Sequence, residues 1–201
     1  MTVRFFQTMF TPAVKAAQTR YGSRGPYSRH DDVVTEPDVL TEQETSFIAE
    51  RDSFYLATVT ETGWPYVQFR GGAPGFVKPI DERRFGFADF RGNRQYVSVG
   101  NLAADNRAAF FFIDYPNRTR LKLVGRLSVI PVSEAPELAA QLIDPNYKAH
   151  IERLIVAEVE AFDWNCPQHI TPRFTQAEIA PSIEALKARI AELEAQLAER
   201  G

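Results

Sequence analysis

Cysteine and long apolar runs are the two features that this chain most clearly lacks. Its one cysteine, Cys166, cannot form a disulfide within the chain, and such sparse use of cysteine fits a reducing compartment. No apolar run approaches the ~20 residues needed to span a bilayer, and no signal-peptide core is recognisable. We therefore expect a cytoplasmic protein that does not enter a membrane.

An excess of positive charge is also lacking, because 23 Lys and Arg residues stand against 26 Asp and Glu residues. The resulting net charge of −3 argues against a general nucleic-acid-binding protein. The sequence carries no Gly-x-Gly-x-x-Gly fingerprint of a dinucleotide site. What it does contain is a hydrophobic share of 44% with 15 phenylalanines over 201 residues, which suits a globular chain with a sizeable core.

The central stretch from Phe54 to Val129 has the pattern of antiparallel strands. Its apolar and β-branched runs are separated by turn signals at Thr62-Gly63, Gly71-Gly72 and Asp81-Glu82. This spacing predicts a β-meander. A short helix should begin at about Asn93, and two long strands should follow around the turn at Pro116-Asn117. The sequence thus predicts an antiparallel barrel that is interrupted once.

Three consecutive phenylalanines, Phe110 to Phe112, fall on one of these strands. Successive side chains of a strand point to opposite faces, so both faces of this strand should be covered. A small barrel has a single interior, and the covering of the second face therefore predicts a second subunit. We expect a homodimer.

Four basic residues lie at or near strand ends and turns, namely Arg70, Lys78, Arg94 and Arg120. They are interleaved with glycines that allow close approach of a ligand to the backbone, at positions 71, 72, 75 and 92. Guanidinium and ammonium groups of this kind can hold a phosphate, and the start of the helix expected from Asn93 would add backbone N–H groups. An ordinary solvated barrel rim is the alternative interpretation.

The first 40 residues should form an N-terminal helix and an extended arm. Thr11 is a good N-cap, Pro12 suits the first helical position, and Gly22 suits the end of the helix. Basic residues precede the first acidic residue, Asp31, so this arm either packs on the barrel or its partner, or contributes a phosphate contact from Arg20 or Arg24.

Residues 41–174 should form the barrel domain, which opens with a capping box of Thr41 and Glu44 before a helix over about 42–51. Ser133 should cap a helix from Pro136 to about 143, and residues 151–162 should form a closing strand.

Residues 175–201 should form an amphipathic C-terminal helix with Pro181 in its first turn. Its apolar residues are spaced as in a coiled-coil seam: Ile183, Leu186, Ile190, Leu193 and Leu197. We expect it to pack along the dimer or to pair with its twin.

The ordered series of motifs between about residues 40 and 130 resembles the FMN-binding split barrel of the pyridoxamine 5′-phosphate oxidase-like family. The corresponding segments are Pro65–Arg70, Phe76–Lys78, Phe87–Phe90, Gly92–Gln95, Asn106–Ala109 and Arg120–Gly125. The fold that this resemblance implies is mainly β with flanking helices.

Three departures from the family pattern concern its substrate more than its cofactor. Gly92-Asn93-Arg94 replaces the Ser-Arg-Lys element of the oxidases, and Gly71–Gly75 lengthens the loop before Lys78. The C-terminal Trp-Arg and Arg-Leu elements that hold pyridoxal in those enzymes are missing. The resemblance therefore implies flavin binding rather than vitamin B6 oxidation.

The resemblance implies FMN as the cofactor, and an oxidoreductase acting on a small organic substrate, with flavin sites between two subunits. The cofactor-binding residues that it implies are Gln68, Arg70, Gly72, Val77, Lys78, Asp89, Asn93, Arg94, Gln95, Arg120, Trp164, Asn165 and Gln168. No general acid or base stands out. The alternatives are a non-catalytic flavin- or haem-binding module, whose axial ligand would be His30, His150 or His169, and a deazaflavin-dependent reductase.

The loop Asp163–Phe174 is unusual because Trp, Asn, Cys, His and two prolines crowd it. Cys166 and His169 could form a nucleophile–base pair or two metal ligands, although no orienting acid and no further cysteine accompany them. We therefore expect no metal site. By resemblance, Trp164, Asn165 and Gln168 form a lid over the flavin of the opposite subunit. A purely structural plug is the alternative.

Overall fold

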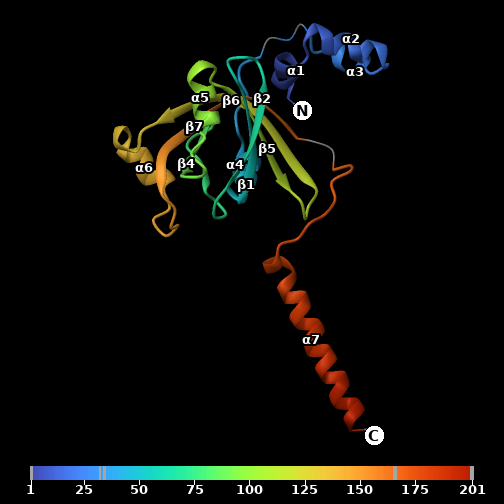
Figure 1. The fold of residues 1–201 in the computed structure, drawn as a ribbon. Helices are drawn as coiled ribbons and strands as arrows, with labels where there is room; N and C mark the ends of the chain where they lie inside the picture. The colour runs from blue at the N-terminus through green and yellow to red at the C-terminus, as the bar shows by residue number, and fades with distance from the viewer. Residues whose placement is uncertain (1, 32, 34, 165–166, 200–201) are drawn as a thin grey trace.

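In the computed structural model, which describes residues 2–31, 33, 35–164 and 167–199, seven strands form one curled antiparallel sheet flanked by helices (Figure 1). The strands are β1 (Ser53–Val59), β2 (Pro65–Gly71), β3 (Val77–Pro79), β4 (Arg84–Phe90), β5 (Arg107–Asp114), β6 (Thr119–Ile130) and β7 (Ile151–Trp164). Their order across the sheet is β2-β1-β5-β6-β7-β4-β3. The expected mainly β split barrel is confirmed.

Three of the four turns that the sequence marks join neighbouring strands. The hairpin β1–β2 closes at Thr60, whose N–H donates to Trp64 O at 2.9 Å, and Gly63 takes a left-handed φ of 86°. The hairpin β5–β6 is closed by Asp114, which accepts from the backbone N–H of Asn117 at 3.0 Å. The three local hairpins, β1–β2, β3–β4 and β5–β6, therefore follow from turn chemistry.

The predicted β-meander is wrong in one respect, because β2 and β3 are not neighbours but the two edges of the sheet. The backbone between them turns toward the start of β1: Gly72 N donates to Asp52 O at 2.9 Å, and Gly75 N donates to Arg51 O at 3.3 Å. At Gly72 the turn is so tight that a Cβ would lie 2.6 Å from Phe76 Cγ. The loop thus carries the chain across the open side of the sheet.

The core lies inside the curl, and its largest fully buried side chains are phenylalanines. Phe54, Phe85, Phe87, Phe110 and Phe112 are at most 2% exposed and contact one another through their rings. Between the buried Phe110 and Phe112, Phe111 points to the outer face, where it is half-buried. The same outer face exposes apolar side chains of β1 and β2, namely Tyr55, Val59, Val67 and Phe69.

Three helices precede the sheet: α1 (Val3–Met9), α2 (Pro12–Arg20) and α3 (Gly25–Ser28). The predicted cap of α2 is confirmed, because Thr11 Oγ1 accepts from Val14 N. α1 was not expected from the sequence. It contacts β7, where Arg4 Nε donates to Glu160 at 2.8 Å.

α4 (Glu42–Ala49) has the predicted capping box between Thr41 and Glu44. Glu44 is only 3% exposed, and its second oxygen accepts from Trp164 Nε1 at 2.6 Å. One side chain therefore caps the helix and joins it to the end of β7.

Replacing Thr41 with alanine should lower the free energy of unfolding by about 1 kcal/mol, because α4 loses its N-cap where it packs on the sheet. Thr175 forms the same capping box at the start of the exposed helix α7. Thr175→Ala is therefore the matched control, and it should leave the urea midpoint of the barrel unchanged. Equal destabilisation by both variants would contradict this assignment.

One helix begins later than the sequence predicts, and another begins where predicted but without the predicted cap. α5 (Val97–Ala104) starts four residues beyond Asn93. Tyr96 takes a left-handed φ of 54°, so the right-handed helix can begin only after it. α6 (Pro136–Leu142) follows a 3-10 turn, η1 (Val132–Glu134), so Ser133 lies inside that turn and is not a cap.

α7 (Gln176–Ala198) begins at the capping box of Thr175 and Glu178, at the start of the segment predicted to be helical, so Pro181 lies inside the helix and not in its first turn as predicted. Every residue from 176 to 199 is exposed, and Figure 1 shows the helix standing away from the sheet. Among the described residues, no helix has both the length and the apolar character required to cross a bilayer.

Candidate functional site

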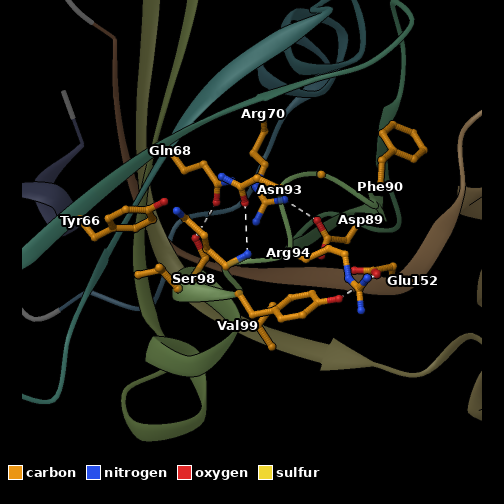
Figure 2. A pocket seen from close by; sticks show the side chains of 14 residues that line it. Tyr66, Gln68, Arg70, Asp89, Phe90, Asn93, Arg94, Ser98, Val99 and Glu152 are labelled. Atoms are coloured by element: carbon orange, nitrogen blue, oxygen red, sulfur yellow. Dashed lines mark hydrogen bonds and ion pairs between the residues drawn. The ribbon is translucent and has the colours of Figure 1, made fainter.

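A cleft forms where β2, the end of β4 and the loop before α5 meet. Alternation along β2 places Tyr66, Gln68 and Arg70 on one face, opposite the outward Val67 and Phe69. Figure 2 shows Gln68, Arg70, Asp89, Asn93 and Arg94 around this cleft. The cavity measures about 50 Å³ in this single chain.

Arg70 is the most enclosed cation of the cleft, with 14% of its side chain exposed. One guanidinium nitrogen pairs with Asp89, and Arg153 lies 3.6 Å from the second oxygen of the same carboxylate. The Nε of Arg70 is buried and has no hydrogen-bond partner among the described residues. A buried donor of this kind normally finds an acceptor, so its position is an observation in favour of a ligand.

Asp89 lies between these two guanidinium groups and is only 4% exposed. Burial raises the pKa of Asp89 above its ordinary value, even though Arg70 and Arg153 act in the opposite direction. The carboxylate therefore holds Arg70 in place at a cost in desolvation.

The loop between β4 and α5 brings polar groups to the rim of the cleft. Arg94 and Tyr96 both take left-handed φ values, 62° and 54°, which cost about 1–3 kcal/mol each and often occur at functional sites. Asn93 Oδ1 accepts from Gln95 N at 3.2 Å. The exposed Arg94 and the first N–H groups of α5 consequently border the same cleft as Arg70.

Glu152 anchors the far wall of the cleft. Its carboxylate accepts from Tyr96 Oη at 3.0 Å and from Arg91 Nε at 3.1 Å, and it pairs with Arg153 at 2.6 Å. Burial acts to raise the pKa of Glu152, but the hydrogen bonds from Tyr96 and Arg91 outweigh it and lower that pKa. On the opposite wall, Ser98 Oγ donates to Gln68 Oε1 at 2.9 Å.

Of the cofactor-binding residues proposed from the sequence, six gather at this cleft: Gln68, Arg70, Asp89, Asn93, Arg94 and Gln95. Four of the others in the same chain lie elsewhere. Val77 is fully buried, Gly72 packs on Phe76, and Lys78 Nζ donates to Gln141 O at 3.0 Å beside a second cavity. Arg120 lies on the outer face of β6 with its guanidinium 5.8 Å from the Phe111 ring.

The described lid residues, Trp164 and Gln168, do not line the cleft of their own chain. Trp164 donates to Glu44 and packs edge-on against Phe47, with ring centroids 4.8 Å apart. Gln168 is exposed, whereas Asn165 and Cys166 lie outside the described residues. Among the described residues, no group of three or more His, Cys, Asp and Glu side chains could hold a metal ion.

Sequence reasoning missed Tyr66, Ser98, Glu152 and Arg153. Tyr66 could have been found, because it is two residues before Gln68 and four before Arg70 on one strand. Glu152 and Arg153 could not, since they come some sixty positions later and reach the site only because β7 pairs with β4, with Arg153 opposite Asp89.

Asp89→Asn should flatten the dependence of folding stability on pH. The folded protein holds a proton on Asp89 more tightly than the unfolded chain does, so stability should fall as pH rises from the ordinary carboxyl range through the raised pKa. Urea unfolding in phosphate-free buffer between about pH 4 and pH 7 would measure this slope. An unchanged slope in the variant would contradict the burial argument.

Asp105→Asn is the control, because at this carboxyl group the expected dependence of folding stability on pH has the opposite sign. A side-chain hydrogen bond from Arg107 lowers the pKa of Asp105 to about 2, so its stabilising effect is present above the ordinary carboxyl range and is lost as pH falls toward that value.

The family model described as pyridoxamine 5′-phosphate oxidase matches residues 40–196. No curated protein matches the chain. Solved structures that are similar include HupZ of Group A Streptococcus, with 14% identity, a TM-score of 0.48, and coverage of 67% of this chain and 99% of that one.

Two further structures show a similar distant likeness. An FMN-binding protein from Syntrophomonas wolfei has 18% identity and a TM-score of 0.47, over 61% of this chain and 83% of that one. An F420 reductase has 20% identity and a TM-score of 0.43, over 62% and 98%. Because the family model covers most of the chain, from the capping box of α4 to the C-terminal helix, the chain belongs to the pyridoxamine 5′-phosphate oxidase-like FMN-binding split-barrel family.

Proposed function

We propose that this protein is a cytoplasmic FMN-dependent oxidoreductase acting on a small organic substrate, and that Arg70 and Arg94 hold the flavin phosphate. The observation that carries this proposal is the buried Nε of Arg70, which lacks a partner among the described residues inside a cleft of convergent polar groups. A phosphate oxygen accepts strong, charge-assisted hydrogen bonds from a guanidinium group.

The donors of the cleft fit a phosphorylated flavin. Arg70 and Arg94 supply charge, and the side-chain amides of Gln68 and Asn93 can serve hydroxyl groups of a ribityl chain. The first backbone N–H groups of α5 add a further site for an anion. Asp89 and Glu152 oppose a negative ligand, but both are already engaged by Arg70, Arg91 and Arg153.

When bound, FMN would supply the redox chemistry, as cofactors of this kind do. The contribution of the chain is binding and orientation. Asp89 fixes the guanidinium of Arg70, Ser98 fixes the amide of Gln68, and Glu152 fixes the hydroxyl of Tyr96. These buttressing contacts hold the donors of the cleft in place before a ligand arrives.

The proposal includes a homodimer with a flavin site at each side of its interface. The cavity of one chain, about 50 Å³, is much smaller than the ~300–1,000 Å³ of typical cofactor sites. The exposed apolar face of β1 and β2 offers a surface for a second subunit. Arg120 lies on the outer face of the sheet with a buried Nε that has no partner among the described residues, so a partner subunit's flavin would supply an acceptor.

The test is an absorption spectrum of the purified protein, followed by mass spectrometry of the small molecule that heat releases. Flavin bands with released FMN would support the proposal and justify a screen of reductants and substrates. A Soret band would replace it with haem binding at His30, His150 or His169. A released deazaflavin, or a colourless protein that does not bind added FMN, would overturn it.

A further inference from the structure

The C-terminal helix α7 presents an apolar stripe that nothing in its own chain covers. The exposed side chains of this stripe are Ile179, Ile183, Leu186, Ile190, Leu193 and Leu197, which are between 39% and 70% exposed. In proteins, most helical stability comes from packing of an apolar face rather than from the intrinsic propensity of the helix. We therefore expect the stripe to pack against a partner.

The central part of the stripe, from Ile183 to Leu193, follows a heptad pattern with a specific choice of residues. Ile183 and Ile190 occupy successive a positions, and Leu186 and Leu193 occupy the d positions that follow them. β-branched residues at a combined with Leu at d favour two parallel strands. Pro181 falls at position f, on the side of the helix opposite the seam, so its ring does not enter the interface.

The charges beside the seam are complementary to a second copy of the same helix. In a parallel pair in register, residue g of one helix meets residue e of the next heptad in the other. These positions are Arg189 and Glu194, of opposite charge, and the two-fold symmetry makes the contact twice. In the single chain Arg189 pairs with the outward Glu192 at 2.6 Å, which leaves Glu194 available.

The composition of the polar face does not suit a lipid surface. Helices that lie on anionic membranes carry Lys and Arg on their polar face. Residues 176–199 contain five glutamates against Lys187 and Arg189 as the only basic residues. The self-complementary seam and charges instead favour an identical helix.

We propose that α7 forms a parallel, in-register two-stranded coiled coil with α7 of a second copy of this chain. This contact is separate from the proposed flavin cleft, and it fastens two subunits together at their C-terminal ends. It does not depend on whether the cleft binds FMN.

Cysteine cross-linking in the full-length protein tests orientation and register together. In a Cys166→Ser background, Ile183→Cys and Leu193→Cys should each form a disulfide-linked dimer under mild oxidation, because both side chains meet their own twin across the seam. Ala188→Cys, at the outward f position of the same helix, is the matched control. Cross-linking at the seam positions should be roughly tenfold faster than at 188, since the seam raises the effective concentration of the thiols.

Each alternative gives a different result. An antiparallel pair would cross-link at one seam position at most, and packing against the barrel, another protein or lipid would give none above the control; any of these would overturn the proposal. Equal rates at all three positions would indicate only that tethered helices collide, and would also overturn it.

Charge exchange provides a second measurement that does not rely on oxidation. Arg189→Glu and Glu194→Arg each place like charges at both contacts, so each should weaken self-association of the full chain. Mixed together, the two variants should prefer the heterodimer, in which both contacts are attractive again. Absence of any preference would count against the parallel register. FMN content, measured on the same samples, should not change, so the flavin proposal is tested separately.

Discussion

Replacing both Arg70 and Arg94 with alanine should release FMN from the protein. Each guanidinium group would lose charge-assisted hydrogen bonds worth on the order of 1.5–3 kcal/mol. The double variant should therefore bind FMN about 10²–10⁴-fold more weakly. Quenching of flavin fluorescence during titration into the cofactor-free protein would measure this change.

The control for this experiment must remove an arginine without touching the cleft. Arg84 lies on β4 with its side chain about half exposed and paired with Asp81, so Arg84→Ala should leave FMN affinity unchanged. Because removal of Arg70 leaves Asp89 buried beside Arg153 alone, the double variant is also made with Asp89→Asn, which removes the stranded carboxylate. If the affinity for FMN is unchanged in both variants that lack Arg70, the assignment of Arg70 and Arg94 to the phosphate is wrong.

Phe112→Ala should remove a large part of the stability of the barrel. The ring of Phe112 is fully buried and lies 5.0 Å from that of Phe54 and 6.0 Å from that of Phe85. Truncation of a buried phenylalanine costs about 3–5 kcal/mol, against a typical total of about 5–15 kcal/mol. Urea unfolding followed by tryptophan fluorescence would measure the loss, since Trp164 ends the last strand.

The same substitution at Phe174 provides the comparison. This ring is 59% exposed in the segment before α7, so its truncation removes little apolar burial. Phe174→Ala should change the free energy of unfolding by less than about 0.5 kcal/mol. A similar loss in both variants would mean that the phenylalanine cluster is not the core that the fold indicates.

Local structure was predictable wherever adjacent residues determine it. The capping box of Thr41 and Glu44 and the turn at Asn117 depend on side chains within four positions of one another. Strand order was not predictable, because no residue near Gly72 in the sequence indicates that its N–H donates to the carbonyl group of Asp52. The choice between a meander and two separated edges is made by this long-range contact.

Some residues of the candidate site could likewise be predicted from the sequence, and others could not. Gln68 and Arg70 could be chosen from the sequence because alternation along β2 puts both on one face. Lys78 has the right chemistry, but the β3–β4 hairpin turns it toward the carbonyl group of Gln141. The late start of α5 was hidden for another reason: the left-handed backbone at Arg94 and Tyr96 is a strain that the surrounding fold imposes, and neither residue type signals it.

The position of β7 has a consequence for synthesis of the chain. β7 is the last strand in the sequence, yet it lies between β6 and β4 and pairs with both. From Phe90 to Ile151 the ribosome needs on the order of 3–12 seconds, during which β4 keeps an unpaired edge, and β6 also keeps one from Ile130 onward. Such edges pair readily with other chains. A nascent chain that stops before β7 therefore exposes two open strand edges, which only the last strand covers.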